Sequence, residues 1–497
     1  METLQLLMAG FATALQPLNL LFALVGCLLG TLIGVLPGIG PSAATAILIP
    51  VTFVLDPTPA IIMLAAIYYG AMYGGTITSV LVNVPGEAAS AVTCLDGYQM
   101  ARQGRAGAAL AIAAIGSFIG GNIAVVVLIV VALPLSNLAL RFGPPEFFAL
   151  MLIGLAMVTG LAGRSIVRAL IGAIFGLVVA MVGIDPVLGA PRFTFGVTHL
   201  FDGFNIIPVV MGLFGISEIF LNVESPSRQV FEGRVSRLIP TREDLRRSFL
   251  PILRGTGIGV LLGPIPGIGT MVPTFIAYTA EKRLSKTPEK FGTGMIEGVA
   301  GPETANNAYA NAAMIPLFTL GIPASPTLAI LMGALMMNGL LPGPLLFQEH
   351  SQFVWAVIAS FVIGNVALLV LNLPLIPMWV AVLKIPYSIL FALILGFAVV
   401  GAYSVDTSVF GIGVMLAFGV LGYLFKKLDI PLAPFALTLV LGPMMEKALR
   451  QSLEMSGGDL SVFYTRPLTA TLLLLAAGIL VVNTVPALSK VKADTEV

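Results

Sequence analysis

The motif PGIG occurs twice in this chain, at 37–40 and at 266–269, and the sequence around it repeats in the same register. Proline removes a backbone donor and glycine permits tight turns, so each copy predicts a break inside an apolar helical stretch. Two interrupted apolar segments at corresponding places in two halves are typical of a transport site built by both halves. Small residues precede each motif at i, i+4 and i+8, and we expect them to pack helices: Gly26, Gly30 and Gly34, then Gly255, Gly259 and Gly263.

The composition indicates an integral membrane protein. The 497 residues are 58% hydrophobic and only 10% charged, whereas soluble domains carry about 25% charged residues. A formal net charge of +1 gives no reason to expect nucleic acid as a partner, and two cysteines cannot build a disulfide framework. We find no phosphate-binding lysine motif, no HExxH and no nucleophile with a nearby base, so the sequence predicts neither an enzyme nor a cofactor.

The repeat predicts an all-α polytopic membrane protein of two inverted repeats, with re-entrant or broken helices and about 11 to 12 membrane spans. The expected divisions are a first repeat at 1–222, an Arg-rich cytoplasmic linker at 223–250, a second repeat at 251–453, and a last span and tail at 454–497. Equivalent loops of the two halves differ in Lys and Arg content, which favours inversion, a periplasmic N-terminus and a cytoplasmic C-terminus. Each PGIG segment is either a re-entrant hairpin or a pair of broken spans.

Two polar groups of residues inside apolar runs are the candidate site. A helix break frees N–H groups that favour an anion, and carbonyl oxygens that can hold Na⁺. Hydroxyls and amides at membrane depth need a partner, which is either another helix or a ligand. The predicted substrate-binding residues are Pro37, Gly38, Gly40, Ser42, Thr45, Thr76, Ser79, Asn83, Pro266, Gly267, Gly269, Thr304, Asn306 and Asn307.

Ion coupling is expected at Gly38, Gly267 and Glu303, with sodium or a proton as the possible ion and no other metal. Glu303 is the sharpest carboxylate, because it lies within the second polar cluster. It can equally serve as a structural partner of a buried donor. Glu87 and Glu297 lie nearby, and we expect them to face interfacial water.

Four segments resemble one protein family: GVLPGIGP at 34–41, AMYGGTITSVLVNVPGE at 71–87, GPETANNA at 301–308 and LGIPASP at 320–326. They are similar to the large membrane subunit of bacterial tripartite tricarboxylate transporters. The resemblance implies a bacterial inner-membrane permease with two partners, a smaller membrane subunit and a periplasmic substrate-binding protein. It also implies ion-driven uptake of small, often citrate-like, carboxylates.

The resulting expectation is a permease that imports small carboxylates by alternating access, with a midplane site between the two PGIG tips. A stand-alone carrier that needs no binding protein is the main alternative. An ion channel and an intramembrane hydrolase are the other two, and the hydrolase requires a nucleophile and base that we do not find.

Overall fold

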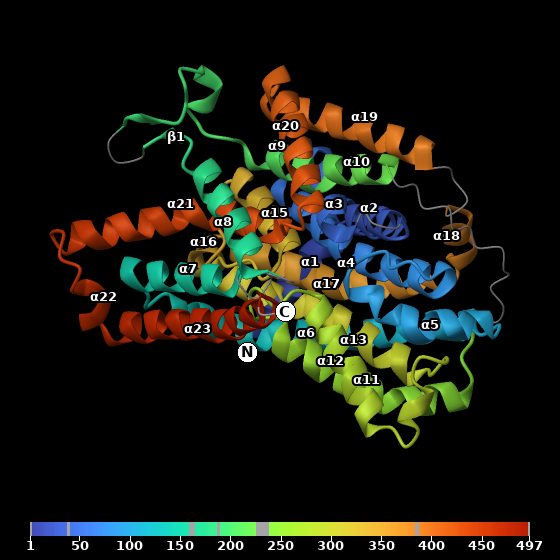
Figure 1. The fold of residues 1–497 in the computed structure, drawn as a ribbon. Coiled ribbons are helices and arrows are strands. Elements are labelled where there is room, and N and C mark those ends of the chain that lie inside the picture. Colours follow the sequence, from blue (N-terminus) through green and yellow to red (C-terminus); the bar gives the residue numbers. More distant parts are fainter. Residues whose placement is uncertain are drawn as a thin grey trace.

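The fold is almost entirely helical. We describe it from a computed structural model, at residues 2–36, 40–158, 165–185, 189–224, 238–382 and 387–495. The strands found in these ranges are β1 (Gly183–Ile184) and β2 (Pro191–Arg192), which pair antiparallel with Gly183 opposite Arg192. Figure 1 shows this small ribbon standing out from the body of helices. The predicted all-α class is therefore confirmed.

The N-terminal half contains ten α-helices in its described ranges: α1 (Glu2–Ala14), α2 (Pro17–Gly34), α3 (Gly40–Leu48), α4 (Pro57–Val82), α5 (Thr93–Arg102), α6 (Ala106–Ala139), α7 (Pro144–Val158), α8 (Ile166–Ala180), α9 (Ile206–Val210) and α10 (Ser217–Glu224). Short elements accompany them, namely η1 (Ile49–Thr52), η2 (Ala89–Ala91), η4 (Thr198–Leu200) and η5 (Met211–Ile216). The last, η5, is a π-helical turn that joins α9 to α10.

The C-terminal half begins with α11 (Arg242–Leu262), so the last part of the predicted linker 223–250 is helical. A capping box at Thr241 and Asp244 starts this helix upstream of the apolar residues. The following elements are α12 (Met271–Leu284), η6 (Pro288–Lys290), α13 (Glu297–Ala312), α14 (Met314–Leu320), α15 (Pro326–Met337), α16 (Pro344–Glu349), α17 (Ser351–Asn372), α18 (Ile376–Val382), α19 (Tyr387–Asp406), α20 (Val409–Lys427), α21 (Leu432–Met455), α22 (Val462–Thr465) and α23 (Pro467–Thr495).

Seven helical segments in the described ranges are long and apolar enough to cross a membrane. They are Pro17–Gly34, Pro57–Val82, Ala106–Ala139, Ile206–Glu224, Ser351–Asn372, Val409–Lys427 and Leu432–Met455. Shorter apolar helices, including α3, α8 and α15, lie between them. The chain is therefore a multi-pass membrane protein, and the total of about 11 to 12 spans stays a prediction.

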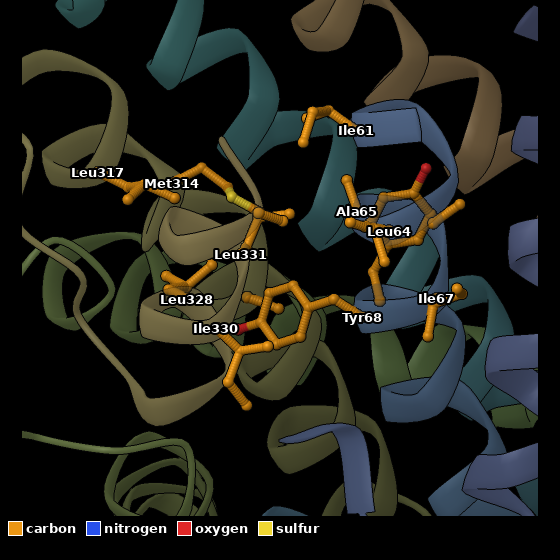
Figure 2. Close-up of a cluster of buried hydrophobic side chains, with 14 of the residues drawn as sticks. Ile61, Leu64, Ala65, Ile67, Tyr68, Met314, Leu317, Leu328, Ile330 and Leu331 are labelled. Atoms are coloured by element: carbon orange, nitrogen blue, oxygen red, sulfur yellow. The ribbon is translucent and has the colours of Figure 1, made fainter. Parts of the chain in front are cut away.

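The centre of the molecule is α4, whose membrane-length window is entirely buried. Figure 2 shows its side chains Ile61, Leu64 and Tyr68 near Met314 of α14 and Leu331 of α15. Elements far apart in sequence thus share one apolar core. Because α4 also ends in a run of polar residues, this core positions the candidate site.

Both glycine series pack helices closely, as predicted. A Cβ atom on Gly30 of α2 would lie 2.4 Å from the carbonyl oxygen of Ile67 in α4. A Cβ atom on Gly255 of α11 would lie 2.3 Å from the carbonyl oxygen of Gly301 in α13. The pairs α2–α4 and α11–α13 therefore contact through their backbones, which small residues permit.

In each half, one long helix packs against helices of the other half. From the N-terminal half, α6 packs along α11 and α13, while α17 of the C-terminal half packs along α2 and α4. The sulfhydryl of Cys27 in α2 lies 3.7 Å from the carbonyl oxygen of Gly364 in α17. This packing between the halves brings polar residues of both into one central region.

Replacing Gly30 with valine should destabilise the protein, because the new side chain meets the backbone of α4, which cannot retreat without moving the helix. Overpacking a core costs about 1–3 kcal/mol. The midpoint of thermal unfolding in detergent measures the effect. Gly257→Val in α11 is the control, because a Cβ there meets no atom within 4 Å; an equal loss in both variants would contradict the packing role.

Candidate substrate and ion site

The second PGIG copy is a tight turn that only glycine fits. Gly267 and Gly269 have φ angles of 80° and 71°. A Cβ atom on Gly267 would lie 2.2 Å from the carbonyl oxygen of Met157, at the end of α7. The amide of Gly267 donates to the carbonyl oxygen of Ala324, with an N···O distance of 3.4 Å. This tip is therefore seated on the segment that leads into α15.

The first copy lies partly outside the described residues, since Pro37 and Gly38 are not among them. Gly40 opens α3 with a φ of 63°. One turn into this helix, the hydroxyl oxygen of Ser42 is 2.8 Å from that of Thr327 in the first turn of α15. Helix α3, which begins at the last residue of the first copy, thus contacts the same segment as the second copy.

The segment 321–327 is consequently contacted both by the second PGIG turn and by helix α3. Ser325 caps α15 by accepting the amide of Leu328 at 3.3 Å. The hydroxyl of Tyr309 in α13 lies 3.5 Å from the carbonyl oxygen of Ala324. Since a helix N-terminus carries partial positive charge, α3 and α15 supply a setting that favours an anion.

A buried carboxylate connects the polar clusters of the two halves. Glu303 of α13 is 1% exposed. Its Oε2 accepts the hydroxyl of Thr76 in α4 at 2.5 Å, and its Oε1 accepts the hydroxyl of Thr93 in α5. This arrangement fits the structural alternative, a partner of buried donors, and it also places a titratable group between the halves.

A second carboxylate lies close by. Glu87, in the turn after α4, is 7% exposed and accepts the side-chain amide of Asn306 at 2.7 Å. The expectation that Glu87 faces interfacial water is therefore wrong, because the turn folds back onto α4 and α13. Glu297 is more exposed and forms two hydrogen bonds with Arg247 of α11, both at 2.8 Å.

The other predicted residues divide by what their side chains contact. Asn307 donates to the hydroxyl of Ser117 in α6 at 2.8 Å. Hydroxyls of Thr45, Ser79 and Thr304 instead donate to carbonyl oxygens of their own helices. Asn83 ends α4 in a left-handed conformation with its side chain exposed, and Pro266 lines an apolar pocket of about 510 Å³ beside α23.

Thr93, Ser117 and the residues 324–327 belong to this region but were not predicted as site residues. Thr93 and Ser117 stand in stretches without a motif, and only the fold brings them to Glu303. The segment LGIPASP did carry a signal, because its Pro–Gly pattern corresponds to that of NVPG in the first half.

Helix α5 links this region to a loop of the other half. Asp96, one turn after Thr93, accepts backbone amides of Gly292, Gly294 and Met295 at 2.8–2.9 Å. Its other oxygen accepts the hydroxyl of Tyr278 at 2.9 Å. The position of Thr93 beside Glu303 is therefore tied to the loop that precedes α13.

No buried cationic side chain is found near the second PGIG turn or α3 in the part of the chain that the structure describes. Among the described residues, every side chain that is charged and buried is a carboxylate. An anionic substrate would therefore rely on backbone amides, helix N-termini and hydroxyls. Such a site suits a hydrogen-bond acceptor with several oxygens.

Comparison with known proteins gives a consistent result. The model of the tripartite tricarboxylate transporter TctA family matches residues 20–437. An uncharacterized 52.8 kDa protein from the TAR-I ttuC' 3' region of Agrobacterium vitis is 47% identical over 98% of this chain and 97% of its own length. An uncharacterized protein from the TAR-II ttuC' 3' region is 47% identical over 43% of this chain and 89% of its own length. No solved structure matches.

Proposed function

The chain belongs to the tripartite tricarboxylate transporter TctA family, and from this membership and the site geometry we propose that it is an ion-driven permease for small carboxylates. It works in the bacterial inner membrane by alternating access. Its two halves form inverted repeats, with the N-terminus in the periplasm and the C-terminus in the cytoplasm. The substrate binds between the two PGIG tips.

The observation that carries this proposal is that the second PGIG turn and helix α3, which follows the first PGIG motif, both contact residues 324–327. Ser42 contacts Thr327, and Gly267 contacts Ala324. Interrupted helices that meet near the bilayer midplane are the usual substrate site of secondary transporters. A citrate-like anion carries several carboxylate oxygens, which suits amides and hydroxyls that belong to both halves.

Ion coupling and partners complete the proposal. Glu303 is held by hydroxyls from α4 and α5, so a change of its protonation or of a nearby ion would act on both halves. The permease works with a small membrane subunit, and a periplasmic binding protein delivers the substrate, in keeping with the tripartite family. We favour a permease that depends on a binding protein over a stand-alone carrier only because the chain belongs to the tripartite transporter family.

Reconstitution into proteoliposomes tests the proposal. The chain and a small subunit of the family are inserted, and uptake of labelled citrate and other small carboxylates is followed with and without a periplasmic binding protein of the same family. Saturable uptake that requires both the binding protein and an imposed ion gradient is expected. Uptake by this chain alone favours the stand-alone carrier, and gradient-insensitive, non-saturable flux favours a channel.

A further inference from the structure

Three buried amide side chains have oxygens without partners where α6, α13 and α17 meet. Asn307 and Asn311 lie on α13 and Asn365 lies on α17, and all are at most 2% exposed. Within the described ranges, no hydrogen-bond partner is found for the Oδ1 atom of each, nor for the Nδ2 atom of Asn365. Buried polar groups are nearly always paired, and each unpaired one costs about 1–3 kcal/mol. This group therefore needs an explanation.

Two of the amides, those of Asn311 and Asn365, lie against the same surface of α6, at Gly121. A Cβ atom on Gly121 would lie 2.9 Å from Oδ1 of Asn365 and 3.2 Å from Nδ2 of Asn311. One turn earlier on α6, the hydroxyl of Ser117 accepts Nδ2 of Asn307 at 2.8 Å. The lack of a side chain at Gly121 thus leaves space on α6 against which the amide groups of both Asn311 and Asn365 lie.

The orientation of these amides is fixed by their donors. Nδ2 of Asn311 donates to the carbonyl oxygen of Asn307 at 2.9 Å, so its Oδ1 is the atom left free. Nδ2 of Asn307 is engaged by Ser117, which leaves its Oδ1 free as well. The unpaired hydroxyl of Tyr69 lies against Gly364, next to Asn365.

The free atoms are mainly oxygens, so the missing partner is a donor or a cation. A divalent ion would need carboxylates to offset its loss of hydration, whereas the three side chains are neutral. Glu303 lies on the same helix, one turn before Asn307. Its backbone carbonyl oxygen accepts the hydroxyl of Ser117 at 3.2 Å. This chemistry suits one small monovalent cation.

We propose that Asn307, Asn311 and Asn365 bind a monovalent alkali cation, with Na⁺ as the probe. The site differs from the PGIG tips and from the Glu303 carboxylate. Its role as the coupling site rests on the proposed transport function, while the binding itself does not. The ligands come from α13 and α17 of the C-terminal half, which pack against α6 of the N-terminal half, so a bound cation joins α13 to α17 beside α6.

Equilibrium binding to the purified chain in detergent tests the site. Radioactive ²²Na⁺ binding and the thermal unfolding midpoint are measured against NaCl, with choline chloride keeping the ionic strength constant and no substrate present. We expect saturable binding and an upward shift of the midpoint specific to Na⁺. Asn365→Ala should weaken binding at least tenfold, and Asn365→Asp should retain it.

Asn338→Ala is the matched control, because the side-chain amide of Asn338, at the C-terminal end of α15, already has a partner. It donates to the carbonyl oxygen of Ala334 at 2.8 Å. Glu281→Gln is a second control and should still bind Na⁺, because Glu281 pairs with Arg254 and belongs to neither the amide group nor the PGIG turns. If the wild type shows no Na⁺-specific binding, or if Asn365→Ala binds as tightly as the wild type, the proposal is overturned. An ordered water would give the first of these results.

The two proposals fail separately. Carboxylate uptake by the complete system with no Na⁺ binding would refute the cation site and leave the transport function standing. Na⁺ binding with no uptake of any carboxylate by the complete system would refute the transport function and leave the site standing.

Discussion

Glu303→Gln should reduce carboxylate uptake more than tenfold while changing the thermal unfolding midpoint little. Glutamine has the shape of glutamate, and the hydroxyls of Thr76 and Thr93 can rotate to donate to its oxygen or accept from its nitrogen. It cannot take up a proton or balance a cation. Uptake under an imposed gradient in proteoliposomes, per mole of inserted protein, is the measurement.

Two further variants separate coupling from folding. Glu303→Leu leaves two buried hydroxyls without their acceptor, so it should also destabilise the protein by about 1–3 kcal/mol for each. Glu281→Gln is the matched control, because Glu281 is another buried carboxylate but pairs with Arg254. It should lower stability and leave gradient dependence intact. Full uptake by Glu303→Gln would show that Glu303 is only a structural partner.

The sequence predicts the local chemistry of this protein better than its contacts. Each PGIG break and each glycine series can be recognised within a single stretch of chain, and the low charge content follows from composition alone. They correctly predicted close helix packing at Gly30 and Gly255 and an all-helical membrane protein. Backbone contact through small residues follows from spacing alone, because residues four apart lie on the same face of a helix.

The contacts that assemble the site could not be predicted in this way. Thr93 and Glu303 are joined across 210 positions, and Ser42 and Thr327 across 285. No periodicity links such residues. Which helices meet is decided by the packing of α6 against α11 and α13, and of α17 against α2 and α4. Glu87 is the clearest case, because its neighbours in sequence indicate a loop and only the fold buries it against Asn306.

Asn122 and Asn365 show a further limit of predicting contacts from the sequence repeat. Asn122 and Asn365 are equivalent in the repeat, as Gly121-Asn122 and Gly364-Asn365. Asn122 donates to the carbonyl oxygen of Phe118 in its own helix, whereas both polar side-chain atoms of Asn365 are buried and have no partner among the described residues. A duplicated sequence therefore does not give duplicated chemistry, because each copy packs against different neighbours.

Gly267→Val should abolish carboxylate uptake and leave membrane insertion intact. Position 267 requires a φ of 80°, which a β-branched residue adopts only at a cost of about 1–2 kcal/mol. The side chain would also meet the backbone of Met157, where a Cβ atom has 2.2 Å of space. Because the tip hydrogen-bonds to Ala324, its displacement should disturb the seat shared with Thr327 and Ser42.

Gly339→Val is the matched control for this backbone strain. Gly339 has a φ of 73° at the end of α15, and a Cβ atom there meets nothing within 4 Å. Both variants pay the same conformational cost, so a loss of uptake confined to Gly267→Val assigns the effect to the tip and its contacts. Insertion is checked by the amount of monodisperse protein extracted from membranes. Normal uptake by well-inserted Gly267→Val would remove the tip from the substrate site, because the turn could then not be part of the binding surface.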